Sequence, residues 1–315
     1  MNRKRNIYKL IILAVIVLLA MAAYMTIGVK FHNERLMRFA FKIRYPKLIA
    51  MVITAFTIGG ASIVFQSVIN NTIVTPCLLG MNSLYTLIHT AVFFLGSGSM
   101  LVINANMSFA LDLVIMGFVA TFIYSYLFKA TNHNVLYVLL IGTVLTSFFS
   151  SIQSTLTRIM DPNEYDTLLT SLVASFSNVN SEIIIAAIIV VFRKELAMLD
   201  VLTLGKEQTV NLGVDYDRCI RRLLLAVTLC ISVATAMVGP ISFLGLIIAN
   251  LSRQMLKTYR HTQLILGSAL FGMIGLIFGQ LIVERVFVYA IPVSVFITVG
   301  GGIYFLYLLL AEKRA

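Results

Sequence analysis

The sequence predicts an all-α protein that crosses a membrane about ten times, and three observations support this prediction. Hydrophobic residues make up 59% of the 315 residues, charged residues only 12%, and the mean hydropathy is +0.95. These values lie far outside the range of soluble domains. In addition, apolar runs near the length of a membrane span, about 20 residues, recur along the whole chain. We therefore expect a single transmembrane domain that covers residues 1–315.

Ten apolar runs are candidate spans, although nine or eleven would also fit the pattern. They lie at 8–29, 47–69, 78–98, 107–128, 135–157, 179–192, 220–238, 241–256, 263–283 and 292–311. The runs at 179–192 and 241–256 are short, which predicts that part of each is tilted, broken or re-entrant. The first run follows a basic stretch and could be mistaken for a secretory signal. It is longer than a usual signal core, so we interpret it as an uncleaved helix.

Small residues at helical spacing indicate where spans approach one another closely. Ala55 with Gly59, and Gly275 with Gly279, leave room for a neighbouring helix. We expect ordinary helix packing at both pairs rather than a moving hinge.

The basic residues test the orientation of the spans. The formal net charge is +11, but the cations lie at the ends of the runs rather than in one patch, which argues against nucleic acid as a partner. With ten spans and a cytoplasmic N-terminus, the C-terminus is cytoplasmic too, and 16 of the 24 Lys and Arg residues lie inside. Six of the eight outer cations fall within 30–47. This local excess suggests a partner on the outer face.

Several kinds of chemistry are missing from the sequence. No G-x-x-x-x-G-K-[ST] motif occurs, so any ATP must be bound by another chain. The four histidines form no H-E-x-x-H motif, and the three cysteines have neither zinc nor disulfide spacing. We therefore expect no metal site, no bound cofactor and no catalytic residue in this chain.

Residues 196–217 form the most informative segment because they mix polar and apolar residues in a chain of membrane spans. Gly205 and Gly213 are expected to divide the segment into short helical turns. Its apolar content is too high for a linker exposed to water. The pattern predicts a docking knob for a cytosolic partner.

Four separated stretches carry a family resemblance. They are Arg44-Tyr45-Pro46-Lys47 with Gln66, Asn70-Asn71 and Pro76–Gly80; Leu204-Gly205 through Leu212-Gly213-Val214; Gly239–Ile247 followed by Arg253; and Pro292-Val293 leading into Phe305–Leu309. In this order the stretches resemble the permeases that import ferric siderophores, haem and vitamin B12, the membrane subunits of type II ATP-binding-cassette importers. The chain departs from the family pattern at Lys47, at Ala249-Asn250 and at Gly300-Gly301-Gly302, which leaves the gate geometry open.

The resemblance implies a multi-pass subunit of the bacterial cytoplasmic membrane, surrounded by lipid, that performs no chemistry itself. A second permease subunit, either identical or related, completes the path. Two cytosolic ATPase subunits use ATP and Mg, and an extracytoplasmic binding protein delivers the substrate. The implied cargo is an iron(III)–siderophore complex, and a catecholate type is favoured.

The resemblance also assigns residues. The expected docking cations for the binding protein are Arg44, Lys47 and Arg285, with lipid-headgroup anchoring as the alternative. The expected ATPase-coupling residues are Leu204, Gly205, Lys206, Glu207, Leu212 and Gly213. Candidate path-lining residues are Gln66, Ser150, Gln153, Ser154 and Thr157, which packing would explain equally well. A polar outer loop at 161–166, followed by a short outer helix at 167–178, is expected near the mouth of the path.

Three alternatives remain at this point. A vitamin B12 or haem permease would keep the family and change the cargo. An ion-coupled secondary transporter would usually place ionisable groups in mid-membrane, whereas Asp112, Glu182 and Glu284 lie near predicted span ends. An intramembrane enzyme would need clusters of histidine and acidic residues that the sequence lacks.

Overall fold

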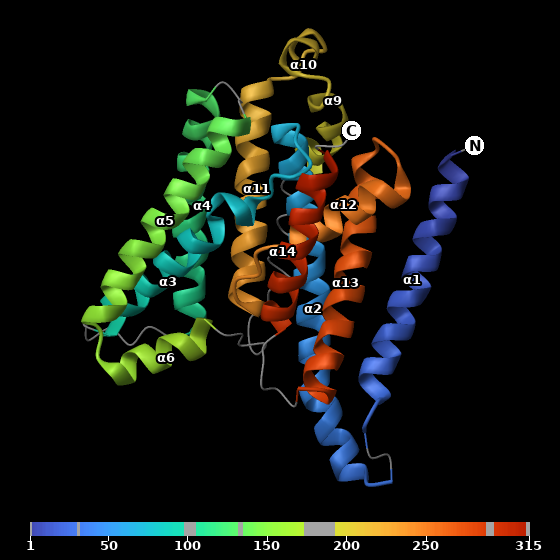
Figure 1. The fold of residues 1–315 in the computed structure, drawn as a ribbon, viewed down its shortest axis with the longest axis vertical. Helices are drawn as coiled ribbons and strands as arrows, with labels where there is room; N and C mark the ends of the chain where they lie inside the picture. Colours follow the sequence, from blue (N-terminus) through green and yellow to red (C-terminus); the bar gives the residue numbers. More distant parts are fainter. Residues whose placement is uncertain are drawn as a thin grey trace.

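The computed structural model describes residues 2–29, 32–97, 105–131, 135–172, 193–287 and 293–312, and the regular elements in these ranges are all helical. Six of these helices are long and apolar enough to cross a membrane. They are α1 (Asn2–Thr26), α2 (Glu34–Ile69), α4 (Ala105–Ala130), α5 (Val135–Ile159), α11 (Tyr216–Val238) and α13 (His261–Arg285). Figure 1 shows the long helices gathered in one bundle. The predicted all-α membrane fold is confirmed.

The remaining elements are shorter. They are η1 (Pro76–Leu79), α3 (Met81–Ser97), α6 (Pro162–Leu172), α8 (Arg193–Ala197), α9 (Leu199–Leu202), α10 (Lys206–Asn211), α12 (Leu244–Leu256) and α14 (Val293–Glu312). Of the ten predicted spans, 179–192 lies outside the described residues, and each of the other nine falls on a helix. The predicted shortness of 241–256 is confirmed, because α12 has only 13 residues. Gly239, with φ 75°, ends α11 ahead of it.

Helix α2 is much longer than the predicted span at 47–69. It runs for 36 residues, which is about 54 Å at 1.5 Å per residue. Its first turn is capped by Asn33, whose side chain accepts hydrogen bonds from the backbone N–H groups of Arg35 and Leu36. Pro46 lies inside the helix, and in Figure 1 the first part of α2 leans away from the remainder. The prediction that the helix begins at 47 is therefore wrong by 13 residues, from 34 to 46.

Helices α2 and α13 pack against each other at small residues. A Cβ added to Gly59 would lie 2.9 Å from Ser268 Oγ, and one added to Gly272 would lie 3.0 Å from Ala55 Cβ. Such close approach provides the van der Waals contact that holds helices together in lipid. The expectation for Ala55 and Gly59 is confirmed. In the second pair, a Cβ added to Gly279 would lie 3.8 Å from Val293 Cγ2 on α14, which is an ordinary contact. The expectation is wrong for Gly275, where an added Cβ would meet no atom within 4 Å.

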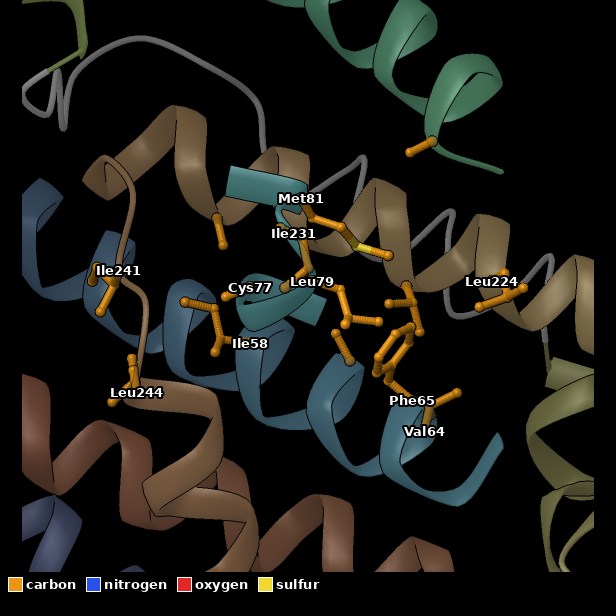
Figure 2. Packing of buried hydrophobic residues seen from close by; sticks show 14 of the residues in the cluster. Ile58, Val64, Phe65, Cys77, Leu79, Met81, Leu224, Ile231, Ile241 and Leu244 are labelled. Carbon is orange, nitrogen blue, oxygen red and sulfur yellow. The ribbon is translucent and has the colours of Figure 1, made fainter. Parts of the chain in front are cut away.

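The core contains a segment of irregular backbone between α2 and α3. Helix α2 ends at Asn70, which adopts the left-handed conformation, and η1 follows inside the bundle. Figure 2 shows Cys77, Leu79 and Met81 from this segment among side chains of α2, α11 and the start of α12. The hydroxyl of Tyr124 on α4 donates to the carbonyl of Leu79 at 2.7 Å. Backbone of this kind is tolerated at membrane depth only when protein surrounds it.

The predicted outer loop at 161–166 is a helix instead. Helix α6 begins at Pro162, and the side chain of Asp161 accepts a hydrogen bond from the backbone N–H of Asn163 at 3.0 Å. The polar residues expected to form a loop therefore make the cap and first turns of α6. The helix ends at Leu172, so the rest of the predicted helix at 167–178 lies outside the described residues.

The two ends of the bundle differ in content. The start of α1, the end of α14 and the segment α8–α10 all lie at one end in Figure 1, which we call the inner end. Helix α6, the end of α13 and the first part of α2 lie at the opposite, outer end.

Candidate functional site

The inner end carries a knob formed by α8, α9, α10 and the turn that follows α10 (193–213), which covers most of the segment 196–217 that is predicted to dock a cytosolic partner. We call this knob the coupling segment after that prediction. Its base is buried and its tip is exposed. Buried side chains are Leu199, Leu202 and Thr209, whereas Leu204, Val210 and Leu212 are exposed by 53%, 53% and 62%. The predicted division by glycine is confirmed, since Gly205 (φ 98°) and Gly213 (φ 80°) adopt backbone conformations that other residues rarely take.

Internal bonds hold the coupling segment in shape. The hydroxyl of Thr209 donates to the carbonyls of Val201 (3.1 Å) and Gly205 (2.7 Å), and so fastens α10 to α9. Lys206 Nζ lies 3.2 Å from the carboxylate of Asp217 on α11. Glu207 remains exposed. An apolar tip on a fastened base is the arrangement that a second protein would cover.

A polar network, which is exposed at Asp200 and buried at His261 and Ser67, connects this segment to the membrane helices. Asp200 on α9 accepts a hydrogen bond from the backbone N–H of His261 at 3.0 Å, and its Oδ1 also meets Nδ1 of the His261 ring. Asp200 therefore caps the start of α13 from a different part of the chain. Because a carboxylate can only accept, Nδ1 carries a proton and Nε2 faces the Ser67 hydroxyl at 2.8 Å.

The same network extends to α12. Arg253 donates through Nη2 to Ser67 Oγ and through Nε to Gln66 Oε1, both at 3.1 Å. Asn250 donates from Nδ2 to the carbonyl of Thr72 at 3.1 Å. The network thus joins α9, α13, α2 and α12 at the inner end. Gln66, a candidate path residue, is a member of this network and is only 1% exposed.

Helix α5 presents a different kind of surface. Four residues with hydroxyl groups recur every four positions along α5. We call them the hydroxyl stripe: Thr143, Ser147, Ser151 and Thr155. All four side chains are exposed on one face of the helix, and each hydroxyl donates a hydrogen bond to a backbone carbonyl of α5. This spacing is visible in the sequence and could have identified the stripe.

The other candidate path residues lie around the hydroxyl stripe. Ser154 is exposed, and Ser150 and Thr157 are half-buried. Gln153 accepts a hydrogen bond from Thr86 on α3 at 3.2 Å, so it faces the neighbouring helix. The assignment of all five residues to a path stays a prediction.

At the outer end, Glu284 on α13 is the centre of a second cluster. Its Oε1 accepts hydrogen bonds from the Tyr24 hydroxyl and from Gln280 Nε2, both at 2.9 Å. Arg44 Nη2 lies 3.8 Å from Oε2, and Lys47 Nζ lies 3.9 Å from Oε1. The cluster joins α1, α2 and α13.

Arg44 has a second contact within the chain. Its Nη1 donates to the carbonyls of Tyr24 (2.7 Å) and Ile27 (2.9 Å), which lie at the end of α1. Arg285 also donates to the Ile27 carbonyl. Arg44 is only 9% exposed, so the expectation of an exposed cation at this position is wrong, because the end of α1 covers it. Its predicted docking role, and those of Lys47 and Arg285, stay predictions.

One further buried pair lies between α3 and α4, where His89 Nδ1 and Asp112 Oδ2 are 2.6 Å apart. Among the residues described, no group of three or more His, Cys, Asp or Glu side chains comes together.

Comparison with known proteins gives consistent results. The sequence pattern of the FecCD transport family matches residues 8–311. The chain is 41% identical to the petrobactin import system permease protein YclO of Bacillus subtilis, over 86% of this chain and 89% of that protein. It is 32% identical to the petrobactin import system permease protein FatC of Bacillus anthracis, over 87% and 79%.

A solved structure, described as an inward-facing conformation of a metal-chelate type ABC transporter, has the same fold. It aligns with a TM-score of 0.76 and 21% identity, over 98% of this chain and 99% of that one.

Proposed function

This chain belongs to the FecCD transport family, and on that basis we propose that it carries an iron(III)–siderophore complex of catecholate type across the bacterial cytoplasmic membrane by alternating access. The chain is a permease of an importer driven by ATP-binding-cassette subunits, and its similarity to two petrobactin permeases makes ferric petrobactin the first candidate cargo.

The structural observation that carries this proposal is the coupling segment. Its tip exposes Leu204, Val210 and Leu212 at the inner end, while Asp200 ties its base to α13. An ATPase that closes on ATP would push a firmly attached knob, and the network of His261, Ser67 and Arg253 offers a route from that push to α2 and α12. In this proposal the two ATPase subunits bind ATP and Mg, and the permease binds neither.

A second permease subunit would face the exposed side of α5. The hydroxyl stripe offers weak hydrogen bonds and no charge, which suits a path that must release a bulky chelate intact. We assign the stripe to this path, together with Ser154. An identical partner is the simplest assembly.

The cargo is tested by uptake of radiolabelled iron in a strain that lacks only this gene. The iron-labelled substrates are ferric petrobactin, ferric citrate, the iron complex of a hydroxamate siderophore, and haem. Vitamin B12 carries its own label, because its metal is cobalt. We expect loss of ferric petrobactin uptake, restored by the intact gene. Loss confined to vitamin B12 or haem would refute the proposed cargo and preserve the family.

The coupling role is tested at Leu212, which is 62% exposed at the tip. Leu212→Asp should leave membrane insertion unchanged and reduce ATPase co-purification at least about tenfold, because a charge would replace an apolar contact. Leu212→Met, which keeps the apolar character, is the matched control. Normal co-purification of the Asp variant would contradict the assignment.

A further inference from the structure

The first part of α2, residues 34–46, projects beyond the outer end of the bundle in Figure 1, and we call it the α2 arm. The helix length explains the projection. The hydrocarbon core of a bilayer is about 30 Å thick, which a helix crosses in about 20 residues. If the 20 residues are counted along α2 from Ser67, which belongs to the network at the inner end, towards the outer end, they reach Lys47. The arm is therefore about 20 Å long, and its lean at Pro46 makes the height that it reaches smaller than this length.

The α2 arm carries two parallel stripes. One stripe is cationic and consists of Arg35, Arg38 and Lys42, all exposed. The second is apolar and consists of Leu36, Phe39 and Ile43, exposed by 48%, 63% and 41%. Both follow the i, i+3, i+7 spacing of a single helix face. The one acidic residue of the arm, Glu34, pairs with Arg38 at 2.5 Å.

Lipid is a poor match for these stripes. An amphipathic helix binds a membrane surface by lying in its plane, with the apolar face down. The α2 arm leans at Pro46, but it remains continuous with a transmembrane helix and projects beyond the outer end of the bundle in Figure 1, so it does not lie flat on the surface. Headgroups occupy only about 5–8 Å on each side of the hydrocarbon core, so the arm reaches past them. An apolar stripe at that height is covered by protein or left in water.

Arg44, by contrast, faces inward. It binds the end of α1 and lies near Glu284, and it is only 9% exposed. Among the described residues, the exposed cations at the outer end are those of the arm, Arg285 at its base, and Arg158 at the end of α5.

We propose that the α2 arm is the primary docking surface for the acidic substrate-binding protein of this importer. The cationic stripe steers and orients that protein, and Phe39 with its apolar neighbours provides the buried contact. This inference rests on the proposed function and moves the main contact outward from Arg44 and Lys47.

The test measures binding of the purified substrate-binding protein, loaded with ferric petrobactin, to the assembled importer in lipid nanodiscs. The first variant combines Arg35→Glu, Arg38→Glu and Lys42→Glu. Removing outer cations does not oppose the positive-inside rule, so the topology should persist. The matched control exchanges Arg35→Lys, Arg38→Lys and Lys42→Arg, which keeps the charge.

We expect the charge-reversed variant to bind about 30-fold more weakly at low ionic strength, and within about threefold of wild type at 0.5 M salt, about the range in which screening becomes strong. A second variant, Phe39→Ser with Leu36→Ser, should weaken binding about tenfold at both salt concentrations. Basal ATPase activity and permease dimerisation should be unchanged in all of them.

Wild-type affinity in both variants would overturn the proposal. So would a loss of affinity that follows from loss of the permease dimer, which would assign the arm to a second copy of this chain. Loss of binding to anionic vesicles as the only effect would assign it to lipid. Failure of the proposed function would look different, because the wild-type importer itself would neither bind the loaded protein nor transport ferric petrobactin.

Discussion

At the scale of single residues, Glu284 is the acidic centre of the outer cluster. It accepts from Tyr24 and Gln280 and lies near two cations, Arg44 and Lys47, while its side chain is only 4% exposed. A buried carboxylate is stable when its charge is balanced and its oxygens are hydrogen-bonded. Here it balances Arg44 and Lys47, which both lie on α2.

Replacing this carboxylate should destabilise the protein. Glu284→Gln keeps the shape but leaves Arg44 and Lys47 without their common counter-charge, which we expect to cost about 3 kcal/mol. Thermal unfolding in detergent can be followed with a thiol-reactive dye, because Cys77 and Cys219 are buried until the protein unfolds.

The exposed pair Glu34–Arg38 supplies the control for that measurement. Glu34→Gln should change the stability by no more than about 0.5 kcal/mol, because solvent screens this pair. Equal shifts for the two variants would contradict a specific role for Glu284.

At the scale of elements, the contact between α2 and α13 depends on how closely the two backbones approach. Gly272 faces Ala55 across this contact, whereas Gly275 on the same helix faces open space. The two glycines therefore separate packing from helix propensity.

We predict that Gly272→Ala destabilises the protein by about 1–3 kcal/mol, because the added methyl group would have to displace α2. Gly275→Ala should be neutral or slightly stabilising, since alanine favours the helix and nothing obstructs it. The same thiol-dye assay measures both variants. A stable Gly272→Ala variant would show that the two helices can move apart at little cost.

The elements also show which predictions a single sequence can support. Nine of the ten spans predicted from apolar runs fall on helices. This signal is reliable because a helix that crosses the lipid needs about 20 apolar residues, whichever helices it packs against. The α2 arm was missed because its cations lower the local hydropathy and because Pro46 suggests a break. Its apolar spacing at Leu36, Phe39 and Ile43 was the available helical signal.

The features of the candidate sites also divide into those that a local sequence signal predicts and those that depend on contacts between distant residues. Gly205 and Gly213 are local signals, so the turns of the coupling segment could be predicted. The contact of His261 with Ser67 joins residues 194 positions apart, and that of Arg253 with Gln66 joins residues 187 apart. Such pairs leave no trace in the spacing of one sequence. For the same reason the charge of Arg44 was visible and its burial was not.

At the scale of the whole molecule, the two ends of the bundle should be accessible from opposite sides of the membrane. Single cysteines at Arg35 and Lys42 should react with an impermeant thiol reagent in intact cells, because the α2 arm is exposed at the outer end. A cysteine at Glu207 should react only in inverted vesicles. Native Cys77 and Cys219 are buried, but Cys230 is only half-buried, so the wild-type chain measures the background labelling.

The reverse labelling pattern would contradict the proposed orientation. Labelling of Glu207→Cys from both sides would show that the vesicles or cells were leaky, and a permeable reagent serves as the control for total reactive thiol.

The irregular segment between α2 and α3 has a consequence for biogenesis. Helix α2 leaves the ribosome before α4 and α5, yet the carbonyl of Leu79 is bonded by Tyr124 of α4, and an added Cβ on Gly142 of α5 would lie 2.5 Å from Leu79 Cδ2. Until those later helices arrive, residues 70–80 have no protein shelter for their backbone and cannot settle in hydrocarbon. We therefore expect this segment to take its final position only after α4, α5 and α11, which contact it in the folded protein, have all been made.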